Sequence, residues 1–221
     1  MSDLFSPFSL RGVTLKNRIV VSPMCMYSCR DDGVPTDWHM QHLVSRSVGG
    51  AGLVITEASA VVPEGRITPA DVGIWNDTQM AAHARIVAAI HATGSVAGIQ
   101  IAHAGRKASR AAPWVHGPAV PGWTCLAPSA EAFEGFAVPQ AMTEADIANT
   151  IAAFAEAAKR SVKAGYRFIE IHGAHGYLGH QFCSPISNRR NDAWGGDFEG
   201  RTRFVREVAT AVRAVIPEDV V

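Results

Sequence analysis

Residues 169–178 read Ile169-Glu170-Ile171-His172-Gly173-Ala174-His175-Gly176-Tyr177-Leu178, an apolar run that leads into two histidines and a tyrosine. Its apolar start, together with Phe168, is typical of a short strand that is buried on both faces, as in a parallel sheet covered by helices. The carboxyl ends of such strands form the edge at which α/β folds bind ligands. We therefore expect His172, His175 and Tyr177 to project into a site.

This trio suits a substrate oxygen that gains negative charge. Two histidines three residues apart can donate hydrogen bonds to one oxygen, and a phenol two residues further on can donate a proton. A His-x-x-His pair can also bind zinc. However, the sequence holds no His-Glu-x-x-His pattern and its four cysteines lack Cys-x-x-Cys spacing, so we predict no metal. Structural histidines that bond to the backbone stay open as a third interpretation.

The composition is that of a globular protein that acts on small molecules. The 221 residues are 48% hydrophobic, enough for a substantial core in one or two domains. Twenty basic and twenty acidic residues give a net charge of zero, which argues against nucleic acid or an anionic membrane as partner. The sequence contains no apolar run of membrane-spanning length and no secretory signal, so we expect a cytoplasmic protein with free thiols.

Strand and helix signals alternate along the chain. The predicted strands are residues 18–22, 53–57, 96–101 and 168–171. A helix follows each strand; the first has Asp37 as its predicted N-cap, the second begins near Asp77, the third begins at Thr143, and the fourth passes through Phe204 and ends before Pro217. This alternation implies parallel strands with right-handed crossovers.

Two α/β folds fit this pattern, an open doubly wound sheet and a (β/α)8 TIM barrel. No Gly-x-Gly-x-x-Gly follows a predicted strand, which disfavours the dinucleotide-binding sheet. A barrel usually needs about 250 residues, so this chain would supply about the first four βα units. Residues 1–221 would then form the N-terminal half of a barrel, with a long loop at residues 107–139 that helps to shape its site.

Polar or small residues follow every predicted strand. The segments after the first three strands are Ser22-Pro23-Met24-Cys25-Met26-Tyr27-Ser28, Thr56-Glu57-Ala58 and Gln100-Ile101-Ala102-His103-Ala104-Gly105-Arg106-Lys107. Together with residues 172–196, they resemble the Old Yellow Enzyme family, in order and over essentially the whole chain. The similarity is greatest to the thermophilic-like branch of NADPH-dependent ene reductases. One such motif is weak, whereas four at successive strand ends are specific.

The resemblance implies an FMN site at the strand ends. The residues that it assigns to the flavin are Ser22, Pro23, Met24, Cys25, Ala58, Gln100 and His172. It places the Cys25 thiol near the reactive edge of the isoalloxazine, where the thiol tunes the reduction potential, and Ala58 where a larger side chain would clash. The Gln100 amide would bond to the pyrimidine edge, which suits a group that both donates and accepts.

The same resemblance implies the reaction. An α,β-unsaturated carbonyl compound, such as an enone or enal, would lose its C=C bond, with NADPH as the reductant of the flavin. His172 and His175 would hold the carbonyl oxygen, and Tyr27 would complete this pocket. Donors at a developing oxyanion are worth roughly 3 kcal/mol each. Tyr177 would protonate the α-carbon on the face opposite the flavin.

The length departs from the family pattern. Loops after strands seven and eight often form the phosphate site of a barrel, and in this family they grip the flavin together with a basic residue of strand five. We therefore expect a complementing C-terminal half, or a homo-oligomer, to cover the open edges of this half barrel. A non-catalytic half-barrel module is an alternative, as is a dienoyl reductase or demethylating relative, which usually adds an iron–sulfur segment.

Overall fold

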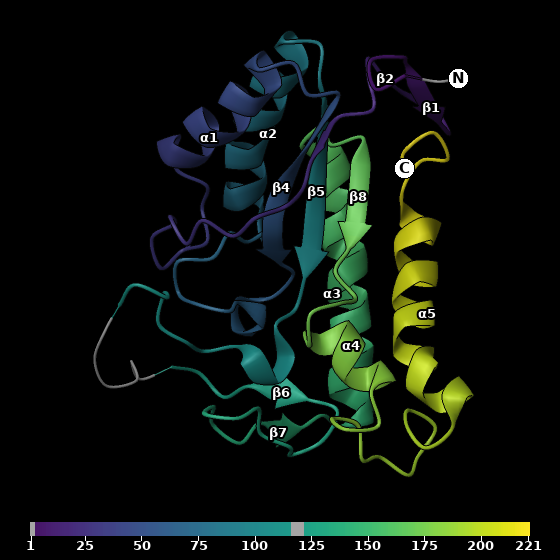
Figure 1. The fold of residues 1–221 in the computed structure, drawn as a ribbon. Coiled ribbons are helices and arrows are strands. Elements are labelled where there is room, and N and C mark those ends of the chain that lie inside the picture. Colours follow the sequence, from purple (N-terminus) through teal and green to yellow (C-terminus); the bar gives the residue numbers. More distant parts are fainter. Residues whose placement is uncertain (1–2, 116–121) are drawn as a thin grey trace.

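The computed structural model describes residues 3–115 and 122–221. Its centre is a parallel sheet in the order β3-β4-β5-β8, formed by Val20–Val21, Leu53–Ala60, Val96–Ala102 and Phe168–Ile171. The helices α1 (Asp37–Val48), α2 (Asp77–Ala92), α3 (Glu144–Lys163) and α5 (Phe198–Val215) alternate with these strands and cover one side of the sheet (Figure 1). This order confirms the predicted α/β fold of successive parallel βα units.

The two faces of the sheet belong to different cores. The helix side holds the main core, which includes Val54, Ile99, Ile101, Phe154 and Val208. On the opposite side, Leu53 and Ile55 pack against Val13 and Leu15 of an N-terminal hairpin. Neighbouring strand residues point to opposite faces, so this division follows directly from the strand geometry. The hairpin side of the sheet is the side that carries the candidate site.

The N-terminal hairpin was not predicted from the sequence. Its strands β1 (Phe8–Leu10) and β2 (Val13–Leu15) are antiparallel, and Figure 1 shows them beside the last residues of the chain. Val221 donates a hydrogen bond to the Arg167 carbonyl (3.1 Å) and accepts one from the Ile169 N–H (2.8 Å). The last residue of the chain therefore pairs with part of the outer edge of β8.

The helix starts show local capping. Thr143 caps α3 as predicted, because its hydroxyl oxygen accepts a hydrogen bond from the Asp146 N–H (3.2 Å). The predicted N-cap of α1 was wrong by one residue: Thr36 is the cap and Asp37 is the first helical residue. The backbone N–H of Thr36 donates to Nδ1 of His39 (2.9 Å), and this bond fixes the start of the helix.

Several segments differ from the sequence prediction. β8 is half-buried rather than buried on both faces, because within the described residues only β5 pairs with it along its length. The first strand shrinks to Val20–Val21, and β4 runs on to Ala60 with a register shift after Thr56. A short helix, α4 (Leu178–Cys183), was missed.

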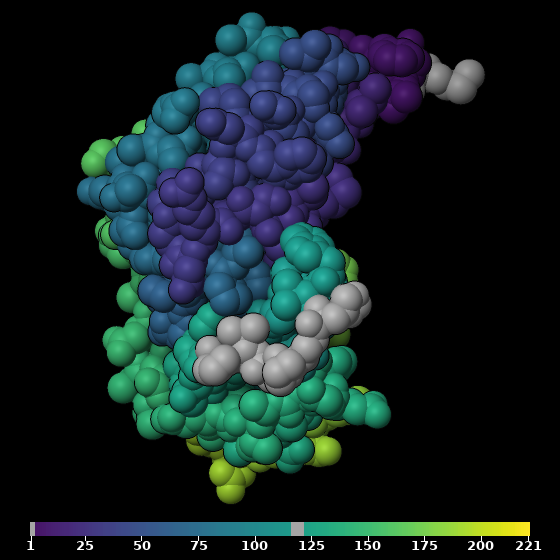
Figure 2. Space-filling model, turned by 90° about the vertical axis from the view of Figure 1, so that its left-hand side faces the viewer, coloured from purple at the N-terminus to yellow at the C-terminus, as the bar shows by residue number. Residues whose placement is uncertain are grey.

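The long loop lies at the carboxyl ends of the strands. It begins in the 3-10 turn η2 (Gly105–Lys107), and β6 (Leu126–Ala127) pairs in parallel with β7 (Gln140–Ala141) near its end. Residues 116–121 of the predicted loop lie outside the described residues. In the space-filling view of Figure 2, the teal residues of the loop lie below the blue residues of the first two βα units. The loop thus borders the site edge.

Candidate active site

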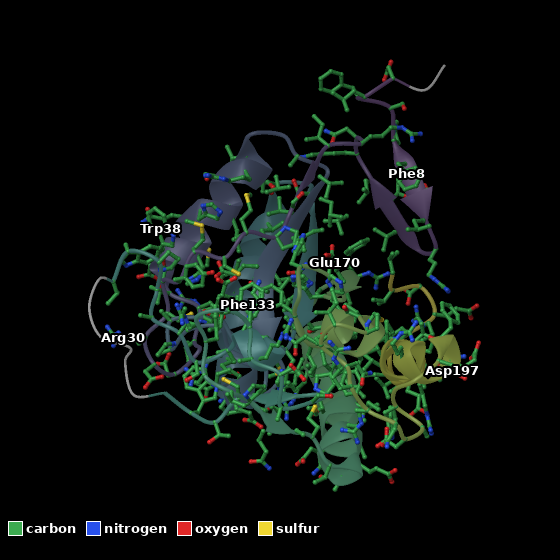
Figure 3. The ribbon with its side chains drawn as sticks, turned by 60° about the horizontal axis from the view of Figure 1, so that its bottom comes forward. Phe8, Arg30, Trp38, Phe133, Glu170 and Asp197 are labelled. Carbon is green, nitrogen blue, oxygen red and sulfur yellow. The ribbon has the colours of Figure 1, made fainter. Side chains whose placement is uncertain are left out.

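A cavity of about 700 Å³ occupies the open face of the sheet. The predicted site residues that line it are Ser22, Pro23, Cys25, Ala58, Gln100, His172, His175 and Tyr177. Phe8 and Glu170, both labelled in Figure 3, line it as well. Met24 and Tyr27 are not among the lining residues: Met24 is 52% exposed, and the Tyr27 ring packs edge-on against Trp114 with 5.8 Å between centroids.

The loop after β8 gathers the two histidines and the tyrosine. The ring centroid of His172 lies 5.2 Å from that of His175 and 4.9 Å from that of Tyr177, with the rings nearly perpendicular in both pairs. His175 and Gly176 have φ angles of 55° and 75°, in the left-handed region. These two residues turn the chain back on itself, so three groups from one short loop meet at the cavity.

His172 is a neutral hydrogen-bond donor at neutral pH. Its Nδ1 accepts a hydrogen bond from the Ala174 N–H (3.3 Å), so the proton of the neutral ring sits on Nε2. Burial, followed by the charges of His175 and Lys107, lowers the pKa of His172 to about 4. No described residue bonds to Nε2, which leaves this N–H available to a ligand.

Tyr177 keeps its proton across the physiological range. Burial is the main cause that raises its pKa to about 12, and the nearby acidic groups of Cys25 and Asp71 add to it, because a tyrosinate would have to form beside them. A phenol that stays protonated beside a neutral imidazole can donate a proton when a strong carbon base forms next to it. One loop therefore supplies a hydrogen-bond donor for an oxygen atom, from His172, and a proton donor, from Tyr177.

A buried carboxylate, that of Glu57, accepts a backbone hydrogen bond from the segment after β3. Glu57, 4% exposed, accepts a hydrogen bond at Oε1 from the Met26 N–H (2.9 Å), and its Oε2 lies 3.6 Å from Nε2 of His39. Burial is the main cause that raises the pKa of Glu57 to about 7. The sequence interpretation gave Glu57 no role, although an acidic residue at the end of an apolar strand signals a buried partner.

Cys25 presents a thiol rather than a thiolate. Burial, followed by the charges of Asp71 and Glu57, raises its pKa to about 12. Because the thiolate is the nucleophilic form, this environment makes Cys25 a poor nucleophile. The thiol can still contact a bound ring as a polarizable group.

Gln100 has a partner that the sequence interpretation also missed. Glu170 lies opposite it on β8, and its Oε1 accepts a 2.6 Å hydrogen bond from Nε2 of Gln100. Both side chains line the cavity. Strand periodicity places Gln100 and Glu170 on the same face of the sheet as Phe168. The sequence does not show that these two strands, about 70 residues apart, are neighbours, so the contact was not predicted.

Within residues 3–115 and 122–221, no three side chains of His, Cys, Asp or Glu converge as metal ligands would. In the same ranges, no helix combines the length and the apolar character needed to cross a membrane.

The sheet presents imidazole, phenol, thiol and amide groups at the carboxyl ends of its parallel strands, which is where α/β folds place their ligand sites. The chain belongs to the NADH:flavin oxidoreductase / NADH oxidase family, whose model matches residues 3–221. This finding confirms the predicted Old Yellow Enzyme family.

Similar proteins agree in sequence and in fold. The NADPH dehydrogenase of Halalkalibacterium halodurans is 49% identical over 213 residues, covering 96% of this chain and 60% of that protein. The NADPH dehydrogenase of Listeria innocua is 51% identical over 217 residues, covering 97% and 61%. A structure of morphinone reductase with tetrahydroNAD matches with a TM-score of 0.87 and 31% identity, over 99% of this chain and 62% of that one. The chain thus forms part of a barrel and spans about 60% of its relatives' length.

Proposed function

We propose that this chain provides the substrate-polarising and proton-donating half of an FMN-dependent ene reductase. The reaction is the reduction of the C=C bond of an α,β-unsaturated carbonyl compound, with NADPH as the source of electrons. The observation that carries the proposal is the pairing of a neutral His172, with Nε2–H available at the cavity, and a protonated Tyr177 whose ring lies 4.9 Å away.

The residues at the cavity fit a flavin ring. Ser22, Pro23 and Cys25 form one wall, and Ala58, 7% exposed, offers a methyl group where a longer side chain would fill the space. Gln100 turns its amide toward the cavity, and the amide suits the donor and acceptor pattern of a pyrimidine edge. When bound there, the flavin supplies the hydride for the β-carbon.

The loop after β8, which we call the His-x-x-His loop, polarises the substrate carbonyl through His172 and His175 and supplies a proton through Tyr177. The Nε2–H of His172, with the imidazole of His175, donates to the substrate carbonyl oxygen and stabilises the negative charge that develops on it. The Tyr177 hydroxyl gives its proton to the α-carbon, and solvent then restores the phenol. The substrate gains one hydride and one proton, so the product is the saturated carbonyl compound.

The proposals about the reductant and about the rest of the barrel rest on the similar proteins. Relatives named NADPH dehydrogenase and a morphinone reductase that binds tetrahydroNAD support a nicotinamide as electron source. Because the chain spans about 60% of these relatives, the proposal includes a C-terminal half, as a separate polypeptide or a continuation, or a second copy, that closes the barrel.

The first experiment is a visible absorption spectrum with a solution mass, for the chain alone and mixed with the C-terminal half of a relative. Yellow protein that NADPH bleaches without oxygen, and that an enone turns yellow again, supports the proposal.

The variant Tyr177→Phe should slow only re-oxidation by the enone, by about a hundredfold. Protein that stays colourless after addition of FMN, both alone and with the C-terminal half, would contradict the proposal. A monodisperse monomer that reduces enones would contradict the need for completion.

The second candidate is a non-catalytic half-barrel module. It predicts no flavin binding under any reconstitution. A panel that contains a simple enone, a conjugated dienoyl compound and an N-methyl amine separates a dienoyl reductase or demethylating activity from ene reduction. The dienoyl compound accepts the hydride through two conjugated C=C bonds, and demethylation oxidises its substrate instead of reducing it.

A further inference from the structure

Lys107 joins three segments next to His175 and Tyr177, two residues that line the cavity. It is the last residue of η2, after β5, and its ammonium donates a 3.0 Å hydrogen bond to the backbone carbonyl of His175. The same ammonium lies 4.8 Å from the ring centroid of Tyr177 and 5.1 Å from that of Phe133. One side chain therefore touches the loop that follows β8, its tyrosine and the long loop.

The loop that Lys107 contacts needs external support. A non-glycine residue in the left-handed region is strained and persists only where its surroundings hold it, and His175 has a φ of 55°. Gly176 follows in the same region, and a Cβ built there would lie 3.6 Å from Cδ and 3.9 Å from Nζ of Lys107. The lysine stem thus packs directly along the turn that presents Tyr177.

The neighbouring basic residue has a different task. Nη1 of Arg106 donates to the carbonyls of Glu131 (3.1 Å) and Ala132 (3.3 Å), so its guanidinium is committed to the long loop. Lys107 is the side chain whose cation reaches both the His175 carbonyl and the Tyr177 ring. A cation is attracted to the negative face of an aromatic ring, so the contact favours one ring orientation.

We infer that Lys107 is a positioning residue that holds the Tyr177 phenol in its proton-donating orientation by fixing the His175-Gly176 turn. This inference rests on the proposed function, because it assigns Lys107 to the proton-transfer step of that reaction. The ammonium acts through the backbone of His175 and the face of the Tyr177 ring. Loss of the cation should therefore slow protonation of the α-carbon without changing electron delivery from NADPH, which does not use the Tyr177 proton.

The test separates the two half-reactions in the FMN-loaded, completed protein by rapid mixing without oxygen. We expect Lys107→Met to slow re-oxidation by an enone about tenfold, a change of about 1.4 kcal/mol in the barrier. Reduction by NADPH should stay within about twofold of the parent rate, and the solvent deuterium isotope effect on re-oxidation should increase. Lys107→Arg keeps a cation and a donor, so it should recover most of the rate.

A matched control is Arg110→Met, because Arg110 is a nearby basic residue, three positions after the end of η2, that bonds to the Gly135 carbonyl (2.8 Å) and covers the Phe136 ring. This variant should leave both half-reactions unchanged. Equal slowing of the two half-reactions in Lys107→Met, or no slowing of re-oxidation, would overturn the inference about Lys107 while leaving the proposed function intact.

A second readout does not need bound flavin. Hydrogen–deuterium exchange of the chain should be faster at residues 173–177 in Lys107→Met than in the parent, and unchanged there in Arg110→Met. Unchanged exchange at residues 173–177 would overturn the inference even if the protein binds no FMN. Faster exchange in a protein that never reduces enones would support the positioning contact and refute the proposed function, so the two failures are distinguishable.

Discussion

Gln100 and Glu170 face each other on adjacent strands and share a 2.6 Å hydrogen bond from Nε2 to Oε1. The Glu170 oxygen is the acceptor of this bond, so the NH2 group of Gln100 is the side that points to Glu170. The Gln100 Oε1 accepts no bond from a described residue and is left for the cavity. Glu170 therefore decides which end of the amide a ligand meets.

Glu170→Gln should weaken FMN binding about tenfold, which corresponds to roughly one hydrogen bond. The new amide can donate as well as accept, so Gln100 would no longer be held in one orientation. Fluorescence quenching of FMN on titration with protein measures the affinity. Glu156→Gln is a suitable control, because Glu156 is an exposed residue of α3 that pairs with Lys159 (2.6 Å). Equal affinity of Glu170→Gln and the parent would show that Glu170 does not orient Gln100.

Glu57 should make folding stability depend on pH. Its pKa is raised from 4.5 to about 7 in the folded chain, so protonated Glu57 stabilises the fold below pH 4.5 and this contribution is lost as the pH rises through 7. Glu57→Gln cannot lose a proton there. The stability of the variant relative to the parent should therefore increase by roughly 3 kcal/mol between pH 4.5 and pH 8.

Urea unfolding of parent and variant at several pH values measures this difference. His39 and Asp71 also titrate near this range, with the pKa lowered to about 4 and raised to about 6. Both are present in the two proteins, so the difference reports the ionisation of Glu57 together with its coupling to these two groups. A constant difference between the two proteins from pH 4.5 to pH 8 would mean that Glu57 is already ionised at the lower pH.

The sequence predicts those parts of the fold that local signals control. Strand β8 was predicted with the residues that the structure gives it, and the α3 cap at Thr143 was predicted because a hydroxyl three residues before an acid is a complete local signal. Thr36 and Asp37 are both good caps, and the imidazole of His39 decided between them. The choice depends on one side-chain contact and not on propensity.

Long-range contacts explain what the sequence interpretation missed. The N-terminal hairpin has strands of three residues, and β1 is exposed throughout, so its periodicity is too short to detect; the hairpin is held by packing of Val13 and Leu15 on β4. The helix α4 has six residues. The partners of Gln100 and Lys107 lie 70 and 68 residues away, and only the pairing of β5 with β8 brings them together.

Cys25 should react slowly with alkylating agents. With a pKa of about 12, its thiolate fraction at pH 8 is roughly a thousandfold below that of a free cysteine, so labelling by iodoacetamide should be slower by about that factor. The rate should rise about tenfold per pH unit up to pH 11 if the fold persists. Mass spectrometry of the peptide that contains Cys25 follows the reaction. Labelling of folded protein as fast as free cysteine would contradict the buried, neutral thiol.

Gly105→Ala should destabilise the chain by about 3 kcal/mol. Gly105 has a φ of 61°, where alanine costs about 1 kcal/mol, and its Cβ would collide with the Gln181 amide. Gln181 donates to the carbonyls of Ala104 (3.1 Å) and Gly176 (2.7 Å), so its displacement also breaks the link to the His-x-x-His loop. Gly94→Ala separates the two costs, because Gly94 has a φ of 75° with no atom within 4 Å of a new Cβ. Equal urea midpoints for the two variants would rule out the collision.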